Sequence, residues 1–447
     1  MKGRKPFLPA LMLSLVVIFS PGCRKSDYSL ELINTITDQG GGTGTTTWTR
    51  DKEYVLNGFV FVNDGQTLTI EAGTVVRGRT GQGSLASALI VARGGKIIAE
   101  GSQTQPIVFT VEGDDLEGSV PVESRGLWGG LILLGNAPIH TETGEDMIEG
   151  IPVSEPRGVY GGPDEDDNSG ILRYVSIRHG GTNIGEGNEI NGLTLGGVGR
   201  QTLIDHVEVI SNADDGVEFF GGLVNCSNLV VAGCGDDAYD IDQGYAGKGQ
   251  FWVAVEGEAS DHCLEISGGT EALANLPGAW PVLHNLTFVG EPGSQRRDLI
   301  HFGHFGGGFI LNSILLHPEK GTAVRYSDLA GDSWALFESG DVGLYKNLLF
   351  PGNETLPLLY AYADDGSDRS AENTILSDSL IAWGTRYDDP GLSVDDAYRL
   401  LPPSTEFPDM AAYENSWFEP VSFKGAFGSN NWVEGWTLVH EAGWVNP

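Results

Sequence analysis

Residues 207–240 read VEVISNADDGVEFFGGLVNCSNLVVAGCGDDAYD, and this stretch contains the same short pattern twice. The pentapeptide at 214–218 (Asp-Asp-Gly-Val-Glu) returns 22 residues later at 236–240 (Asp-Asp-Ala-Tyr-Asp), and the apolar segments that precede the two copies keep the same offset. A third copy begins 25 residues further on, at 261–265 (Asp-His-Cys-Leu-Glu). Self-similarity at a short period indicates a repeat architecture in which each repeat packs against its neighbours.

Short strands broken by glycine flank these repeats. Residues 88–91 (Ala-Leu-Ile-Val) and 106–110 (Pro-Ile-Val-Phe-Thr) are examples, and no helical period accompanies them. A period near 22 that holds three short strands predicts one coil of a parallel β-helix, with coils stacked about 4.8 Å apart. The predicted fold class is therefore all-β, a right-handed parallel β-helix of the pectin-lyase-like type with an irregular C-terminal cap. A β-propeller fits less well, because its repeats run to about 40–50 residues.

The solenoid is expected to span residues 52–350 in about a dozen coils. Longer loops are expected at 111–125, 140–170 and 270–280. Residues 351–447 are less periodic and rich in Pro, Asp and Trp. They are expected to form terminal coils and a cap that covers the open end of the sheet.

The N-terminal segment has the order of an export signal. Residues 1–22 carry basic residues ahead of an apolar run at 8–19, and Cys23 follows Gly22 directly. This pattern is typical of a bacterial lipoprotein signal, whose cleavage leaves a lipidated Cys23; an ordinary secretory signal with an incidental cysteine is the alternative. The apolar run is short for a membrane span. Residues 23–51, which include a glycine-rich tract, are expected to form a flexible tether.

Composition limits the partners of the chain. Its 447 residues include 26 basic and 61 acidic ones, and the formal net charge is −35. This acidity argues against nucleic acid as a partner, because phosphate binding needs clustered Lys and Arg. With Cys23 assigned to lipid, Cys226, Cys234 and Cys263 remain, an odd number without metal-ligand spacing. We expect these three to be buried or free thiols.

Stacked coils bring equivalent repeat positions into columns. Carboxylates one coil apart repel each other, so a stack of them needs a cation, a shared proton or full exposure to water. Calcium suits such a stack, because it takes about six to eight oxygen ligands in irregular geometry. Alternatively, the Asp-Asp sequences are ordinary solvated turns. The fifth position of the repeat and its looser copies gives Thr194, Glu218, Asp240, Glu265, His301 and Arg325. The candidate Ca²⁺ ligands are Asp214, Asp215, Glu218, Asp236, Asp237, Asp240 and Asp242.

The same side chains are candidates for catalysis and for ligand binding. Part of the pattern resembles the aspartates of polygalacturonase-type hydrolases, although the family's Gly-His-Gly and Arg-Ile-Lys segments have no clear match here. A Ca²⁺-dependent lyase would additionally need a base. Aromatic rings near the column could stack on a sugar, or could fill the coil interior. The candidate catalytic residues are Asp214, Asp236, Asp237 and Asp240. The candidate ligand-binding residues are Tyr239, Tyr245, Trp252, Glu265, His301 and Arg325.

Several motifs resemble those of a family of β-helix lipoproteins from Bacteroidota-type bacteria. They lie at 126–138 (Gly-Leu-Trp-Gly-Gly-Leu-Ile-Leu-Leu-Gly-Asn-Ala-Pro), 149–152, 166–170, 204–252 and 424–437. The resemblance implies a β-helix at the outer membrane, encoded beside a TonB-dependent receptor and often given a multidrug-transporter name. It brings no catalytic residues. A lipidated β-helix without a membrane span cannot itself be a transporter.

The sequence therefore favours a non-enzymatic, lipid-anchored β-helix that binds a ligand, with carbohydrate as one candidate, or that assists a TonB-dependent uptake receptor. Two alternatives stay open. One is a Ca²⁺-dependent polysaccharide lyase or glycoside hydrolase that uses the stacked carboxylates. The other is a structural or adhesive surface protein.

Overall fold

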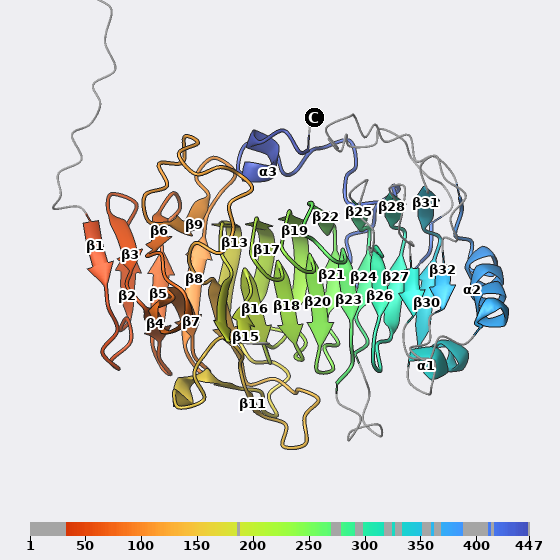
Figure 1. The fold of residues 1–447 in the computed structure, drawn as a ribbon, viewed down its shortest axis with the longest axis horizontal. Helices are drawn as coiled ribbons and strands as arrows, with labels where there is room; N and C mark the ends of the chain where they lie inside the picture. Colours follow the sequence, from red (N-terminus) through yellow and green to blue (C-terminus); the bar gives the residue numbers. More distant parts are fainter. Residues whose placement is uncertain are drawn as a thin grey trace, which may run out of the picture.

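The computed structural model describes residues 33–185, 188–269, 279–290, 298–316, 324–326, 333–350, 359–361, 368–387, 410–412 and 415–445. Short strands follow one another along one long axis and pair in parallel from coil to coil (Figure 1). The predicted parallel β-helix is thereby confirmed, and each coil contributes strands to two large sheets.

One face of the β-helix is a ten-stranded sheet with a single strand from each coil. From the N-terminal end it contains β4 (Phe59–Val62), β7 (Ala88–Val91), β10 (Leu131–Leu134), β16 (Leu193–Gly196), β18 (Val217–Phe220), β20 (Tyr239–Asp242), β23 (Leu264–Ile266), β26 (Ile300–Phe302), β29 (Val324–Tyr326) and β32 (Leu359–Ala361).

An eighteen-stranded sheet forms the remaining faces. It contains β1 (Ile33–Ile36), β2 (Thr46–Trp48), β3 (Glu53–Leu56), β5 (Thr67–Ile70), β6 (Val75–Gly78), β8 (Lys96–Glu100), β9 (Ile107–Val111), β13 (Gly170–Arg178), β17 (Leu203–Ile210), β19 (Asn225–Ala232), β21 (Lys248–Gln250), β22 (Val253–Val255), β24 (Val282–His284), β25 (Thr287–Val289), β27 (Gly308–Leu311), β28 (Ile314–Leu316), β30 (Val342–Tyr345) and β31 (Leu348–Phe350).

A residue in the left-handed backbone region marks the corner between two faces in several coils. The φ angle is +55° at His206, +54° at Asn228 and +57° at Asn285. Asparagine enters this region most easily among residues with a side chain, because its short amide bonds locally. The corner is mild enough in β13, β17 and β19 for each strand to continue through it, which is why β13 pairs with both β8 and β9. One sheet therefore covers two sides of the coil.

The interior of the coils is apolar along the whole axis. Val217 and Phe219 on β18 and Tyr239 and Ile241 on β20 belong to one continuous core cluster. Successive side chains on a strand point to opposite faces. The residues between these, including Glu218, must therefore face outward.

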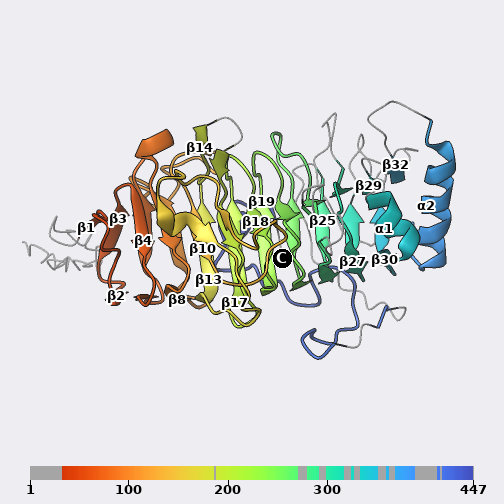
Figure 2. The ribbon, with the colours of Figure 1, turned by 90° about the horizontal axis from the view of Figure 1, so that it is seen from below.

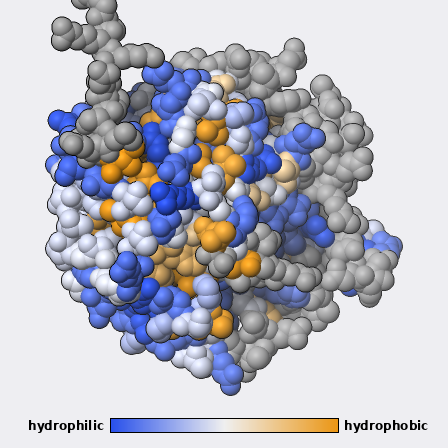
Figure 3. Space-filling view, turned by 60° about the vertical axis from the view of Figure 1, so that its left-hand side comes forward, coloured by the Kyte–Doolittle hydropathy of each residue, from blue (hydrophilic) through white to orange (hydrophobic). Residues whose placement is uncertain are grey.

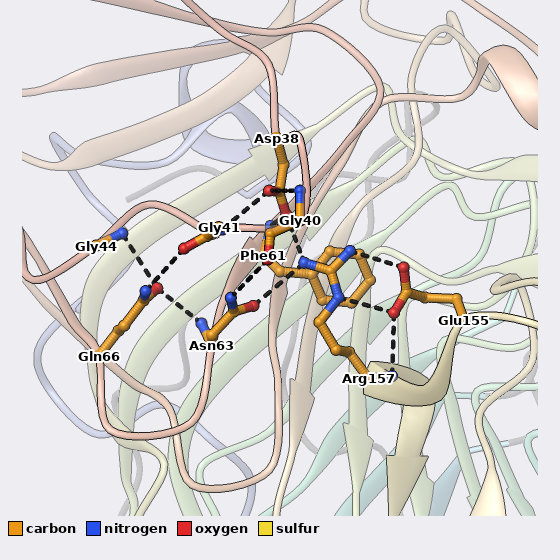
Figure 4. A network of polar contacts seen from close by, with 10 residues as sticks. Asp38, Gly40, Gly41, Gly44, Phe61, Asn63, Gln66, Glu155 and Arg157 are labelled. Carbon is orange, nitrogen blue, oxygen red and sulfur yellow. Dashed lines mark hydrogen bonds and ion pairs between the residues drawn. The ribbon is translucent and has the colours of Figure 1, made fainter.

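Two strands of the first coils lie inside the segment that the sequence predicts to be a flexible tether. β1 pairs with β3, and β2 pairs with β5, so the β-helix begins at least by Ile33 rather than at residue 52. The reason is that Asp38 organises the glycine-rich tract: its Oδ1 accepts hydrogen bonds from the backbone N–H groups of Gly40 at 2.7 Å and Gly42 at 2.9 Å (Figure 4). Glycine supplies the positive φ that this turn requires, +95° at Gly40.

The C-terminal region differs from the predicted cap. α1 (Ser333–Ser339) and α2 (Ser370–Ala382) lie at the far end of the β-helix, as expected of a cap (Figures 1 and 2). Residues 415–445, including α3 (Leu438–Glu441), instead run back along the side of the molecule. They pack an apolar cluster that includes Phe427, Trp436 and Val439 against the outward face of the eighteen-stranded sheet. We call residues 415–445 the C-terminal strap.

An insertion between β10 and β13 covers part of the ten-stranded sheet. It contains the antiparallel pair β11 (Asp146–Met147) and β12 (Val159–Tyr160), with a short 3-10 turn at Pro156–Gly158. A second 3-10 turn lies at Gly83–Leu85, and β14 (Thr182–Gly185) pairs with β15 (Asn188–Ile190) beside it. Ile139, Ile151 and Tyr160 of the insertion pack with Ile132 and Phe220 of the sheet. The long loop predicted at 140–170 is therefore a folded cover.

The surface at the N-terminal end mixes polar and apolar residues. Figure 3 turns this end toward the viewer and shows hydrophobic residues in separate groups between hydrophilic ones. Ile33, on the end strand β1, is 46% exposed. The helices found in the described part of the chain are all too short or too polar to cross a membrane. The predicted signal (1–22) and Cys23 lie outside the described residues, as does most of the loop predicted at 270–280.

Candidate functional site

The outward residues of the ten-stranded sheet form one line along the axis. We call Thr194, Glu218, Asp240, Glu265, His301 and Arg325 the outer column. The strand register pairs each of these residues with the next one in that order. The column predicted from the repeat is thus confirmed position by position. Glu218 is 7% exposed, and the side chains of Glu265 and Arg325 are 28% and 31% exposed, so the line emerges toward solvent along the axis.

A second line of polar residues runs beside the first. Asn191, Asp215, Asp237, His262 and Asp298 each lie two residues ahead of their strand, and we call them the turn column. The backbone N–H of Asp237 donates to Asp215 Oδ1 at 2.9 Å, and the backbone N–H of His262 donates to Asp237 Oδ1 at 2.8 Å. Each carboxylate is therefore held by the next coil, which fixes its direction.

Two groups of carboxylates meet where these columns are most acidic. Asp215, Glu218 and Asp240 form one group, and Asp214, Asp215 and Asp236 form the other; within each group, one oxygen per residue lies within 4.8 Å of the others. Burial, reinforced by the charge of Asp240, raises the pKa of Glu218 well above its usual value. Burial and the charges of Glu149 and Asp236 raise the pKa of Asp214 to about 7. Without a cation the cluster must therefore retain protons close to neutral pH.

The insertion contributes to this cluster a residue that the sequence did not identify. Asn191 Nδ2 donates to Glu149 Oε1 at 3.0 Å and also bonds Glu218 Oε2. Burial raises the pKa of Glu149, which adds another proton-retaining acid. Glu149 comes from a loop outside the repeat, so periodicity gives no signal for it. Asn191 occupies the repeat position of Asp215 and could have been found by extending the turn column upstream.

The donor set is suited to a hard cation. It consists of carboxylate oxygens on adjacent coils, with Asn191 beside them, and calcium prefers oxygen ligands of this kind. Asp240 Oδ1 is buried, and none of the described residues donates a hydrogen bond to it. A buried carboxylate oxygen without a donor is costly unless a proton or a cation satisfies it. Asp214, Asp215, Glu218, Asp236 and Asp240 therefore fit the Ca²⁺ prediction.

Two other predicted ligands lie elsewhere. Asp237 turns to the next coil, where its Oδ1 lies 2.9 Å from His262 Nδ1. Asp242 accepts a hydrogen bond from the backbone N–H of Gln243 at 2.6 Å and belongs to neither carboxylate group. The four candidate catalytic aspartates are consequently divided: Asp214 and Asp236 share one group, Asp240 joins Glu218, and Asp237 pairs with a histidine. The described residues do not unite all four in one group.

Toward the C-terminal end of the β-helix, the outer column changes from acidic to basic side chains. His262 Nδ1 and His301 Nδ1 lie 3.5 Å and 3.3 Å from Glu265 Oε2. Burial alone would lower the pKa of His262, but Asp237 beside it reverses this effect, and the pKa rises to about 10. Burial opposes ionisation of Glu265, yet the hydrogen bond from His301 holds its pKa at about 2. Arg325 Nη1 contacts Asp298 Oδ2 at 3.4 Å one coil further on.

His262 was missed although the repeat contains it. It stands where the two preceding copies have Asp215 and Asp237, at the second position of the pentapeptide. Because this position is acidic in the two preceding copies and histidine in the third, the acidic pattern alone does not identify it.

The three aromatic residues proposed as ligand contacts are interior residues. Tyr239, Tyr245 and Trp252 are fully buried, and their rings pack against those of Phe219 and Phe288. Their polar atoms bond to backbone carbonyl groups: Tyr239 Oη to Val253 at 2.8 Å, Tyr245 Oη to Val224 at 2.8 Å, and Trp252 Nε1 to Cys226 at 3.0 Å. The prediction that these rings contact a ligand is therefore wrong, because their strand positions face inward. Glu265, His301 and Arg325, in contrast, do face outward.

The remaining cysteines behave as expected. Cys226, Cys234 and Cys263 are buried and unpaired by disulfides. Burial raises the pKa of Cys234 to about 12, so this thiol is not reactive at neutral pH.

A family of known proteins has the same architecture. Residues 40–342 match the model of a family described as a pectate-lyase-like β-helix domain. Among solved structures, a pectin methylesterase from Aspergillus niger is similar over 79% of this chain and 97% of its own length, with 12% sequence identity and a TM-score of 0.28. No curated protein matches the chain.

Proposed function

The chain belongs to the family of pectate-lyase-like β-helix domains, and from this premise we propose that it is a lipid-anchored protein that binds an acidic polysaccharide with the help of Ca²⁺. The observation that carries the proposal is the outer column. It runs without interruption over six coils, with carboxylates at one end and His301 and Arg325 at the other. Five spacings of about 4.8 Å give a track of about 24 Å, which suits an extended polymer better than a small solute.

Each end of the track has its own role toward an anionic sugar. Bound Ca²⁺ supplies positive charge that offsets the carboxylates and attracts the acid groups of the polymer. Asp215, Glu218 and Asp240 hold the ion, while Glu149 and Asn191 orient and enclose Glu218. Arg325 binds a carboxylate directly, because its guanidinium is charged at every physiological pH. The negative charge of the whole chain makes the cation necessary rather than optional.

Binding without catalysis fits the site better than lysis or hydrolysis. A lyase needs a base that is free to accept a proton at neutral pH. The imidazole of His262 already has carboxylate partners, because its Nδ1 lies 2.9 Å from Asp237 Oδ1 and 3.5 Å from Glu265 Oε2. Arg325 lies four coils from Glu218. The aspartates proposed for hydrolysis are divided between separate groups.

The direct test is a screen of purified protein against uronic-acid polymers, with and without millimolar Ca²⁺. We expect saturable binding that requires Ca²⁺, is lost in Asp240→Asn and survives in Asp166→Asn, a control in the exposed loop between β12 and β13. Unsaturated products or new reducing ends would replace the binding proposal with catalysis. Absence of binding to any polymer would favour the structural or adhesive alternative.

The anchor and the partner form a second part of the proposal. Cys23, directly after the signal at 1–22, is the site of lipidation, and the lipid holds the β-helix at the outer membrane. A TonB-dependent receptor would then take up what the β-helix captures. Replacing Cys23 with serine is expected to move the protein from the membrane fraction to the soluble fraction. Co-purification of a TonB-dependent receptor with the wild type, but not with that variant, tests the partner; its absence from both contradicts the receptor role.

A further inference from the structure

Two histidines and a glutamate meet on the outward face of the ten-stranded sheet, beyond the carboxylate groups. His262 and Glu265 come from one coil, and His301 comes from the next coil in register with Glu265. One potential ligand atom from each of the three residues lies within 4.8 Å of the others. The side chains of His262 and His301 are 5% and 12% exposed, so water is largely excluded from the imidazoles.

The distances between these atoms are similar to those between neighbouring ligand atoms in a metal site. Glu265 Oε2 lies 3.5 Å from His262 Nδ1 and 3.3 Å from His301 Nδ1. In a tetrahedral site with bonds of about 2.1 Å, neighbouring ligand atoms are about 3.4 Å apart. The two contacts that involve the glutamate therefore already have the length that a bound ion requires.

The charges around the imidazoles also call for a cation. Glu265, Asp237 and Asp261 all approach His262, with the Asp237 contact at 2.9 Å and the Asp261 contact at 3.9 Å. The rings of His262 and His301 lie 4.8 Å apart between centroids. A divalent ion placed among these atoms would contact His262, Glu265 and His301 together.

We propose that His262, Glu265 and His301 form a binding site for a transition-metal ion of the Zn²⁺ class, with Asp237 as the nearest further carboxylate. Two imidazole nitrogens and a carboxylate oxygen are the ligand set of such ions, whereas the oxygen-only groups at Asp215, Glu218 and Asp240 suit Ca²⁺. Outer contacts hold the ligands in place: Ser267 Oγ donates to Glu265 Oε1 at 3.4 Å, and the backbone N–H of His262 is bonded to Asp237. Such contacts orient metal ligands in proteins.

The site goes beyond the proposed polysaccharide binding and does not depend on it. It lies on the same track, one to two coils beyond Asp240, so an ion here could contact the same polymer. Its ligand chemistry is nevertheless distinct, and this difference allows the two sites to be tested separately.

The test is a titration of the purified full-length chain with Zn²⁺ in the presence of saturating Ca²⁺, followed by calorimetry and by the visible absorption of Co²⁺ as a spectroscopic probe. We expect one equivalent of Zn²⁺ to bind and Co²⁺ to show the absorption of a nitrogen- and oxygen-ligated ion. His301→Ala and Glu265→Gln are each expected to weaken binding by about tenfold or more. His440→Ala, in the C-terminal strap, is the matched control and should bind as the wild type does.

Each outcome is decisive for this site. If the wild type does not bind Zn²⁺, or if both His301→Ala and Glu265→Gln bind it as tightly as the His440→Ala control, the proposal is overturned. Circular dichroism and melting of each variant verify folding, and Glu265→Gln preserves the shape of the site if His301→Ala does not fold. Asp240→Asn separates the two proposals, since it should impair Ca²⁺ binding and leave Zn²⁺ binding intact.

Discussion

Asp214, which belongs to a carboxylate group with Asp215 and Asp236, shows most clearly how single acids of the site respond to pH. Its pKa in the folded protein is about 7, raised first by burial and then by Glu149 and Asp236, whereas an unfolded aspartate titrates near about 3.9. The folded state therefore binds the extra proton, and this contribution to stability is complete below about pH 4 and is lost as the pH rises through about 7.

The corresponding prediction concerns the melting temperature in EDTA. We expect it to fall between pH 5 and pH 8, and we expect millimolar Ca²⁺ to restore it at pH 8, because the cation replaces the protons. Asp214→Asn should make the decline shallower. His262 contributes over a different range, since its stabilisation is lost only as the pH rises through about 10. A melting temperature that is independent of pH and of Ca²⁺ would contradict the account of these acids.

A substitution at Tyr239 tests whether its ring is part of the core or contacts a ligand. Tyr239→Phe removes the hydrogen bond to the Val253 carbonyl at 2.8 Å while the ring stays in place. We expect a loss of about 1–3 kcal/mol in the free energy of unfolding, measured by denaturant titration, because a buried carbonyl loses its partner. Polysaccharide binding should be unchanged. A lower affinity for the polysaccharide with an unchanged free energy of unfolding would indicate that the ring contacts the ligand.

At the scale of elements, the N-terminal coil depends on one polar network. Asp38 Oδ2 accepts a hydrogen bond from Arg157 Nη1 at 2.6 Å, and Arg157 also binds Glu155 (Figure 4). The guanidinium lies over the ring of Phe61, 3.7 Å from its centroid. Arg157 thus joins the insertion to the first coils.

Asp38→Ala is expected to loosen these first coils selectively. It removes the acceptor for Gly40, Gly42 and Arg157 and should cost about 2 kcal/mol. Hydrogen exchange should become faster in β1 and β2 and remain unchanged in β18 and β20. If exchange in β1 and β2 of the variant were as slow as in the wild type, residues 33–48 would not depend on Asp38.

The C-terminal strap is attached through a buried acid. Glu208 accepts hydrogen bonds from the backbone N–H groups of Leu438 at 3.0 Å and Val439 at 2.8 Å, and from Ser176 Oγ. Arg178 lies close enough to favour its charge, although burial raises the pKa of Glu208. The strap therefore depends on an interaction between residues 230 positions apart in sequence.

Glu208→Ala is expected to release the strap from β17. The substitution removes the acceptor for the backbone N–H groups of Leu438 and Val439, and each buried donor left without a partner costs about 1–3 kcal/mol. Limited proteolysis should cut near α3 in this variant and spare the wild type, while Glu208→Gln, which keeps the acceptor oxygen, should be cut more slowly. Cleavage at equal rates in all three proteins would contradict this attachment.

At the scale of the whole molecule, the repeat determined what could be predicted. The 22-residue offset placed Glu218 beside Asp240, and the looser copies placed His301 and Arg325 in the same line. Features that lie outside the repeat could not be predicted from it. Glu149 reaches the column from an insertion, and the strap binds strands far away in sequence. The glycine tract resembled a tether because its order depends on Asp38, which no periodic pattern identifies.

Binding of a cation by the outward carboxylates is tested most directly by calorimetric titration of Ca²⁺ into EDTA-treated, dialysed protein. We predict saturable binding that Asp240→Asn weakens by about tenfold or more, because a charge-assisted contact is worth about 1.5–3 kcal/mol. Asp166→Asn should bind Ca²⁺ as the wild type does. Absence of saturable heat in the wild type, or equal affinity in Asp240→Asn, would contradict the account.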